Sequence, residues 1–198
     1  MDSYLVPTLT LLIALGVLEA ASHRMHFRPA LVRKAVHVGM AALIIFFSLL
    51  FDYSIFIWLG IAFGILMLIL RFTKPLKSLS DRHKQSYGEV FFPFGVTAAA
   101  LFSHSTANFI AVISILGLAD TAAYFIGGAV KSPKLLFSKT LAGSIVCATV
   151  TFLIALFVVQ PVFAALVGLA VACIEAVSPR GSDNLTIPIV SAALIAFA

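Results

Sequence analysis

The chain has 198 residues, of which 62% are hydrophobic and only 11% are charged, and its formal net charge is +5. A soluble domain is nearer half apolar and a quarter charged, so this composition excludes an ordinary soluble fold and indicates an integral membrane protein. The basic residues lie in short stretches between apolar runs. That arrangement is typical of membrane topology signals and excludes nucleic acid as the expected partner.

Apolar runs recur along the whole chain, at lengths near the roughly 20 residues that a helix needs to cross a bilayer. We therefore expect residues 1–198 to form a single all-α membrane domain, a bundle of about eight transmembrane helices, with seven to nine as the range. The fourth and eighth spans are short and contain Pro93 and Pro188, so either could be re-entrant or broken. The expected spans cover residues 4–22, 36–51, 54–70, 87–103, 108–130, 141–159, 162–178 and 185–198.

The connections between these spans predict an orientation. All 13 Lys and Arg residues fall on one side of an eight-span bundle. The other side carries polar residues such as Asp52 and His104 but no Lys or Arg. Because cytoplasmic loops collect Lys and Arg, we expect the basic side in the cytoplasm and both termini outside. Anionic lipid headgroups of the bilayer or a soluble anion are the partners expected for these cations.

Four acidic residues fall within the expected spans. Ionisable groups in a bilayer are costly, face the protein interior and commonly serve a function. Three of the four lie near the cytoplasmic ends of their spans, and Asp120 lies further inside. We expect the acids to meet the basic residues in a pocket that faces the cytoplasm; the alternative is that paired charges only hold helices together. The four are Glu19, Glu89, Asp120 and Glu175.

Asp120 begins the strongest local pattern in the sequence. Asp120, Tyr124 and Gly127 share one helix face because they are spaced i, i+4 and i+7. Small residues on that face allow a neighbouring helix or a ligand to come close. A buried carboxylate opposite a basic loop is a candidate Mg²⁺ ligand, since nucleotide-bound Mg²⁺ takes one or two carboxylates together with phosphate oxygens. A packing seam of small residues would explain the glycine but not Asp120.

The stretch from Ser138 to Ser144 lies where a basic loop enters the sixth span. A helix N-terminus offers free N–H groups and the positive end of its dipole, which suits a phosphate. Lys139 adds a positive charge, and Ser138 and Thr140 add hydroxyl groups. The Walker A pattern is absent, and a lysine at a helix start is commonly only a topology signal.

Similar clusters begin the second, fourth and eighth spans. Each has a structural alternative. The cluster at the second span could be a basic anchor at the membrane surface, and the one at the fourth span a Pro/Gly break. At the eighth span, Asp183 or Asn184 could be the N-cap of the last helix, with Pro188 in its first turn. The three clusters are Arg33, Lys34 and His37; Gly88 and Glu89 with Pro93; and Glu175 with Asp183 and Asn184.

Taken together, these motifs resemble one known family across residues 33–188. They are similar to the motifs of the CTP-dependent lipid-alcohol kinases, the phytol kinase, dolichol kinase and diacylglycerol kinase relatives of the phosphatidate cytidylyltransferases. The segments that carry the resemblance, in chain order, are Arg33–Gly39, Gly88–Gly95, Asp120–Gly127, Ser138–Ser144 and Glu175–Pro188.

The resemblance implies that the γ-phosphoryl group of CTP passes to the hydroxyl of a lipid alcohol held in the membrane, with Mg²⁺ as cofactor. An isoprenoid alcohol such as phytol, geranylgeraniol or dolichol is favoured, and diacylglycerol stays open. Asp120 and Glu175 would bind the metal, and Glu175 or Asp183 would complete the metal site or accept the hydroxyl proton. The residues expected around the nucleotide and its phosphates are Arg33, Lys34, His37, Glu89, Gly127, Ser138, Lys139, Thr140, Gly143 and Asn184.

Two other functions remain open at this stage. The first is synthesis of CDP-diacylglycerol from phosphatidate and CTP, but the C-terminal H-G-G…D-R-x-D pattern associated with those enzymes is missing. The second is a small lipid or ion transporter that uses the acids as a proton relay. A transporter should show acids at the membrane midplane and an inverted repeat. Here the acids cluster toward one side of the bundle, and no internal repeat is evident.

Overall fold

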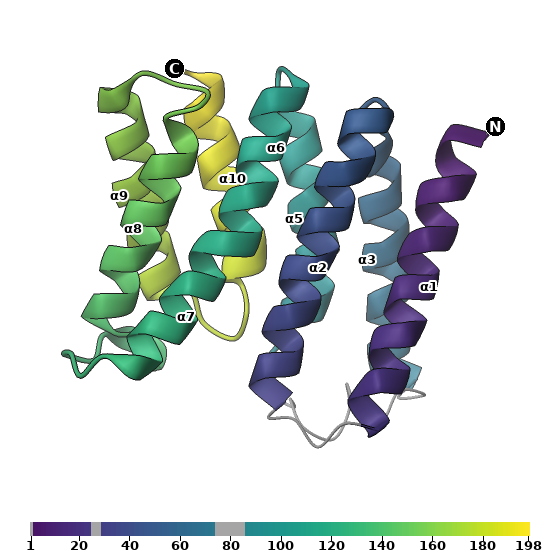
Figure 1. Cartoon of the computed structure of the whole chain (residues 1–198), viewed down its shortest axis with the longest axis horizontal. Helices are drawn as coiled ribbons and strands as arrows, with labels where there is room; N and C mark the ends of the chain where they lie inside the picture. The colour runs from purple at the N-terminus through teal and green to yellow at the C-terminus, as the bar shows by residue number, and fades with distance from the viewer. Residues whose placement is uncertain (1, 25–28, 74–85) are drawn as a thin grey trace.

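A computed structural model describes residues 2–24, 29–73 and 86–198 of the chain (Figure 1). Within these ranges the long elements are all helices, which confirms the predicted all-α class. One of them is continuous from residue 106 to 129 and contains a short π-helical segment, η1, between α6 and α7. The elements are α1 (Asp2–Arg24), α2 (Pro29–Leu50), α3 (Ile55–Thr73), α5 (Gly88–Phe102), α6 (Thr106–Ser114), η1 (Ile115–Ala119), α7 (Asp120–Ala129), the 3-10 turn η2 (Leu136–Ser138), α8 (Leu141–Ala155), α9 (Pro161–Val177) and α10 (Asp183–Ala196).

The starts of several helices follow from local sequence. Ser105 and Thr140 precede α6 and α8, and their side chains accept hydrogen bonds from the backbone N–H groups of Asn108 and Gly143. Both are N-caps that satisfy an otherwise unpaired donor of the first helical turn. Pro161 occupies the first turn of α9, where its missing N–H costs nothing. These three helices begin within two residues of the predicted spans, whereas α2 begins at Pro29, seven residues before its predicted span.

The last helix differs from the sequence-based expectation. It begins at Asp183, so Pro188 lies in its interior and not in the first turn. Ser182 occupies the N-cap position without a side-chain cap bond, so the predicted capping role of Asp183 or Asn184 is wrong. The physical reason is that both side chains have distant partners, Lys139 in the α7–α8 connection for Asp183 and Gly88 of α5 for Asn184. Pro93 likewise lies within α5, and neither proline interrupts its helix.

The helices have the composition of membrane spans. Within the described residues, three segments are long and apolar enough to cross a bilayer, 33–50, 55–73 and 106–129. Five further apolar helical segments are shorter, at 10–17 residues. Large apolar side chains such as Trp58, Phe72 and Leu49 project outward from the bundle. Exposed apolar surface of this kind fits a protein that is surrounded by lipid.

Small residues allow the helices to pack closely. A Cβ atom added at Gly60 of α3 would lie 2.2 Å from Thr97 Oγ1 of α5. A Cβ added at Gly168 of α9 would lie 2.8 Å from the carbonyl oxygen of Ala148 on α8. Without a hydrophobic driving force between helices in lipid, association depends on such close van der Waals contact. Glycine is therefore required at these crossings.

The bundle has two unlike ends. Figure 1 shows both chain termini at one end, with the α2–α3, α5–α6 and α8–α9 connections. We call this the terminal end. The opposite end, which we call the basic end, is formed by the start of α2, the end of α3, the start of α5 and the α7–α8 and α9–α10 connections. Among the described residues, the Lys and Arg residues belong to this second end: Arg33 and Lys34 lie near the start of α2, Arg71 lies near the end of α3, and Lys131, Lys134, Lys139 and Arg180 lie in the two connections.

Candidate active site

Three buried carboxylates meet at the basic end. Asp120 is the first residue of α7, Glu175 lies near the end of α9, and Asp183 is the first residue of α10. One carboxylate oxygen from each lies within 4.8 Å of the others. We call these three residues the carboxylate cluster. Three negative charges this close repel one another strongly, so the arrangement requires cations.

Two lysines supply part of the required charge. Lys34 of α2 forms an ion pair with Asp120, and both side chains are buried. Lys139, in the α7–α8 connection, forms an ion pair with Glu175, and its Nζ lies 3.0 Å from Asp183 Oδ2. Three carboxylates and two ammonium groups leave one negative charge among these five side chains. The cluster therefore has capacity for a further positive charge.

Lys139 is fully charged in this environment. Burial favours the neutral amine and lowers the pKa, but the nearby carboxylates of Asp183, Asp120 and Glu175 act in the opposite direction and outweigh it. The pKa of Lys139 therefore lies above its ordinary value of 10.5. A permanent cation at this position can compensate the acids or bind an anionic ligand.

A π-helical segment positions Asp120. Residues 115–119 form η1, directly before Asp120 in an otherwise α-helical stretch. His37 Nε2 of α2 lies 3.1 Å from the carbonyl oxygen of Leu116, and a Cβ at Gly117 would come within 2.7 Å of the Ala41 side chain. This close contact between α2 and η1 brings Lys34 to Asp120. Single π turns inside α-helices occur frequently at functional sites.

Gly127 and Gly143 form the crossing between α7 and α8. A Cβ at Gly127 would lie 2.6 Å from Thr140 Oγ1, and one at Gly143 would lie 3.0 Å from the carbonyl oxygen of Ala123. Thr140 Oγ1 donates to the carbonyl oxygen of Gly127 at 3.3 Å and accepts from Gly143 N at 3.2 Å. The two glycines therefore make the packing seam that the sequence offered as an alternative. Their crossing brings Lys139 and the start of α8 next to the carboxylate cluster.

The start of α10 is fixed by contacts with α5. Asn184 Nδ2 donates to the carbonyl oxygen of Gly88 at 3.0 Å, and a Cβ at Gly95 would lie only 2.0 Å from the Asn184 carbonyl oxygen. Gly181 adopts a φ of +84°, and a Cβ there would lie 2.7 Å from Gly88 N. A side chain at either glycine would separate the α9–α10 connection from α5. These contacts hold Asp183 in place.

Glu89 has a cation of its own. It forms an ion pair with Arg71 at the end of α3, and the Arg71 guanidinium carbon lies 3.8 Å from the centroid of the Tyr87 ring. Arg71 also donates to the carbonyl oxygen of Ser86 at 2.7 Å. From the sequence, Arg71 is only one of the basic residues that indicate topology, because its partner Glu89 lies on another helix.

Of the remaining predicted site residues, some lie at the carboxylate cluster and others do not. Arg33 lies on an exposed part of α2, whereas Lys34 next to it is buried against Asp120. The side chains of Ser138 and Glu19 lie outside the described part of the structure. Ser144, one turn into α8, lies with its Oγ 3.5 Å from Glu175 Oε2. The structure thus brings Lys34, Lys139 and the three carboxylates together and places Arg33 at the edge.

The chemistry of the cluster fits Mg²⁺. Carboxylate oxygens are the hard ligands that this ion takes in proteins, usually one or two together with phosphate oxygens. The three carboxylates provide such oxygens in one place, and the negative charge that Lys34 and Lys139 leave uncompensated favours a bound cation. Asp120, Glu175 and Asp183 are the residues that could hold the metal.

The structure is an apolar helical bundle, of a composition that fits a membrane protein, with a buried centre of acids and lysines at one end. The chain is 30% identical over 196 residues to the phytol kinase of Synechocystis sp., covering 89% of this chain and 82% of that protein. No family model matches the chain. No solved structure matches it either. On this identity and coverage the chain belongs to the phytol kinase family of lipid kinases. The resemblance drawn from the motifs is thereby confirmed at the level of the family.

Proposed function

We propose that this protein transfers the γ-phosphoryl group of CTP to the hydroxyl of an isoprenoid alcohol, with Mg²⁺ as cofactor. The observation that carries the proposal is the convergence of three carboxylates and two lysines at the basic end of a phytol kinase family member. Phosphoryl transfer needs positioning and charge neutralisation more than covalent help from the protein. These five side chains supply both.

The carboxylate cluster would hold the metal, with Asp120 and Glu175 as the proposed ligands. The metal neutralises charge that develops on the phosphates. Lys34 and Lys139 then exchange carboxylate oxygens for phosphate oxygens, which are equally good partners for an ammonium group. The other residues proposed around the nucleotide are Arg33, His37, Glu89, Gly127, Ser138, Thr140, Gly143 and Asn184.

The proposed transfer forms one bond and breaks one bond at the γ-phosphorus. The alcohol oxygen forms a bond to the γ-phosphorus while the bond from that phosphorus to the β–γ bridging oxygen breaks, which releases CDP. The hydroxyl proton leaves to a carboxylate, and we assign Asp183 or Glu175 as its acceptor because each belongs to the cluster and is buried. The products are an isoprenyl monophosphate and CDP.

We further propose that all eight helical segments cross the bilayer, with the basic end in the cytoplasm and both termini outside. The nucleotide then arrives from the cytoplasm and the alcohol from the bilayer. Single-cysteine labelling at His104 and at a position in the 74–85 connection tests this orientation. The two positions should react from opposite sides, and reaction of both from the same side would overturn it.

The decisive test of the reaction uses purified protein in detergent with CTP labelled at either the γ- or the α-phosphate. Geranylgeraniol, phytol, a dolichol and diacylglycerol serve as separate acceptors, and ATP as an alternative donor. Label from the γ-position alone should enter an isoprenoid alcohol. Label from the α-position would show cytidylyl transfer and refute the proposal.

A further inference from the structure

The connection between α7 and α8 is an ordered loop at the basic end. It covers residues 130–140, and we call it the α7–α8 loop. Lys134 and Thr140 form an antiparallel bridge across it, and the backbone N–H of Leu135 donates to the carbonyl oxygen of Lys139 at 2.7 Å. Figure 1 shows this loop at the lower left, where it projects sideways from the bundle.

The tip of the α7–α8 loop exposes large apolar side chains. Leu136 and Phe137 are each 60% exposed, and Leu135 beside them is also exposed. Phe137 has a φ of +52°, in the left-handed region that a bulky side chain rarely adopts. A glycine would relieve this strain at no cost in packing, because the ring contacts little of the protein. An exposed and strained aromatic residue therefore indicates surroundings that are partly apolar.

Two lysines flank this apolar tip. Lys131 and Lys134 are both exposed, and neither forms an ion pair with a described residue. Aromatic and aliphatic side chains next to lysines are typical of segments that lie between the headgroups and the acyl chains of a bilayer. Lysines near a bilayer surface are attracted to anionic lipids. The charges of the loop therefore distinguish anionic headgroups from neutral ones.

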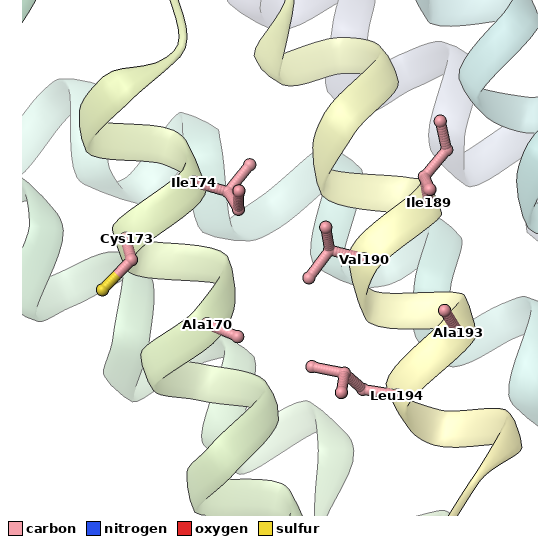
Figure 2. A pocket seen from close by; sticks show the side chains of 7 residues that line it. All are labelled: Ala170, Cys173, Ile174, Ile189, Val190, Ala193 and Leu194. Atoms are coloured by element: carbon pink, nitrogen blue, oxygen red, sulfur yellow. The ribbon is translucent and has the colours of Figure 1, made fainter.

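This charge is what the other apolar surface of the structure lacks. The groove between α9 and α10 is lined only by apolar side chains, among them Ile174 and Leu194 (Figure 2). Such a lining accepts any acyl chain and indicates no particular occupant. At the α7–α8 loop, apolar tip and lysines together indicate one chemical class, an anionic phospholipid.

We propose that the α7–α8 loop inserts its tip into the headgroup layer at the basic end and binds anionic phospholipids there through Lys131 and Lys134. The same loop carries Lys139, whose Nζ lies 3.0 Å from Asp183 Oδ2. Insertion of the tip therefore fixes the segment that delivers Lys139 to the carboxylate cluster. The inference goes beyond the proposed kinase reaction, and lipid contact is measured without nucleotide or alcohol.

Fluorescence quenching by brominated lipids tests this contact. The chain has one tryptophan, Trp58, which is first replaced by phenylalanine, and Phe137→Trp then provides a reporter at the tip. The protein is placed in nanodiscs of phosphatidylcholine that contain the same fraction of either brominated phosphatidylglycerol or brominated phosphatidylcholine. Both lipids should quench the reporter, and the anionic lipid should do so at least about twofold more strongly, because the lysines enrich it locally.

The matched control is Phe157→Trp in the same background. Phe157 is 89% exposed in the α8–α9 connection at the terminal end, and residues 156–160 of that connection include no Lys or Arg. The two brominated lipids should quench this reporter equally. Lys131→Gln with Lys134→Gln, combined with Phe137→Trp, should remove the preference for the anionic lipid and retain quenching by phosphatidylcholine.

Each other outcome overturns part of the inference. No quenching of the Phe137→Trp reporter by either lipid would show that the tip lies in water. Equal quenching by the two lipids would refute binding of anionic phospholipids, and a preference that survives in the double glutamine variant would refute the role of the two lysines. The kinase reaction is tested separately with labelled CTP, so absence of transfer together with a retained lipid preference would refute the reaction alone.

Discussion

The two ends of the bundle are held together by different kinds of interaction. At the terminal end, connections are short and are held mostly by near neighbours in the chain, apart from the bond that Tyr53 Oη donates to the carbonyl oxygen of Ser103 at 2.9 Å. Asp52 Oδ1 accepts from Ser54 N at 2.8 Å, and Ser105 Oγ accepts from Asn108 N at 3.2 Å. These bonds satisfy backbone groups at a turn and at a helix start, which is what any connection between helices needs.

At the basic end, the interactions join residues that lie far apart in the chain. Lys34 pairs with Asp120 across 86 positions, and Lys139 pairs with Asp183 across 44. Burying charges in this way rarely stabilises a fold relative to apolar packing. The buried charges at the basic end are therefore what our proposal of a ligand site there requires, and no comparable group of charges is present at the terminal end among the described residues.

The largest expected effect is that of Asp120→Asn on turnover. The amide keeps the size of the side chain but removes the charge that would bind Mg²⁺, so turnover should fall at least about 100-fold. Lys34 then loses its buried partner, which lowers thermal stability. The double variant Asp120→Asn with Lys34→Met removes both charges and should recover stability but not turnover. Turnover near that of the parent protein in either variant would make Asp120 a structural residue.

Lys139→Ala should have the next largest effect. The KM for CTP should rise about 10- to 100-fold, the scale of a lost hydrogen bond from a charged donor. The pKa of Lys139 is raised, so its contribution to stability is fully present below pH 10.5 and is lost only as the pH rises through the folded-state value. The stability difference between Lys139→Ala and the parent protein should therefore stay constant from about pH 7 to 9, by thermal unfolding. A difference that vanishes in this range would show that Lys139 is not held as a cation.

Substitutions of the neighbouring residues Lys34 and Arg33 compare a buried cation with an exposed one. Lys34→Met leaves Asp120 as a buried charge without its lysine, so the loss of stability should be about 3–5 kcal/mol. Arg33→Ala removes an exposed cation and should change stability little. Its KM for CTP should rise less than that of Lys139→Ala, since an exposed charge is screened. Equal effects of the two substitutions on folding would contradict their different burial.

The smallest effect is expected at the terminal end, for Asp52→Asn. The hydrogen bonds with Ser54 hold the pKa of Asp52 below its ordinary value of 3.8. Whatever the carboxylate contributes to stability is present above that pH and is lost only as the pH falls through the folded-state pKa. Turnover of Asp52→Asn should match that of the parent protein, and its thermal stability should be only slightly lower above about pH 5, a difference that shrinks as the pH falls through the folded-state pKa. A loss of turnover comparable with that of Asp120→Asn would remove the distinction between the two ends.

The sequence predicted the helices well because each span is a long apolar run bounded by polar or capping residues. It also predicted that Asp120 and Glu175 meet in one pocket with the basic residues, although it placed Asp120 further inside its span. It could not tell that Lys34, and not Arg33, faces Asp120. Adjacent residues on a helix point about 100° apart, and hydropathy alone does not fix how α2 is rotated against its neighbours.

Other features of the site left no readable pattern. The π segment at 115–119 depends on how α2 packs against it, and its residues are apolar like the rest of the span. Gly127 and Gly143 could be ascribed to a ligand or to packing, and only the distance between α7 and α8 shows the packing role. The capping role expected for Asp183 and Asn184 was wrong because the sequence does not show their long-range contacts. Their long-range partners, Lys139 and Gly88, are on other elements.

The most direct measurement of the central claim is Mn²⁺ binding followed by electron paramagnetic resonance, with and without CTP and without any alcohol. Mn²⁺ takes the same oxygen ligands as Mg²⁺. We expect one CTP-dependent Mn²⁺ site in the parent protein and in Asp52→Asn, and its loss in the folded double variant of Asp120→Asn with Lys34→Met. Identical Mn²⁺ binding in all three proteins would contradict the assignment of the carboxylate cluster as the metal site.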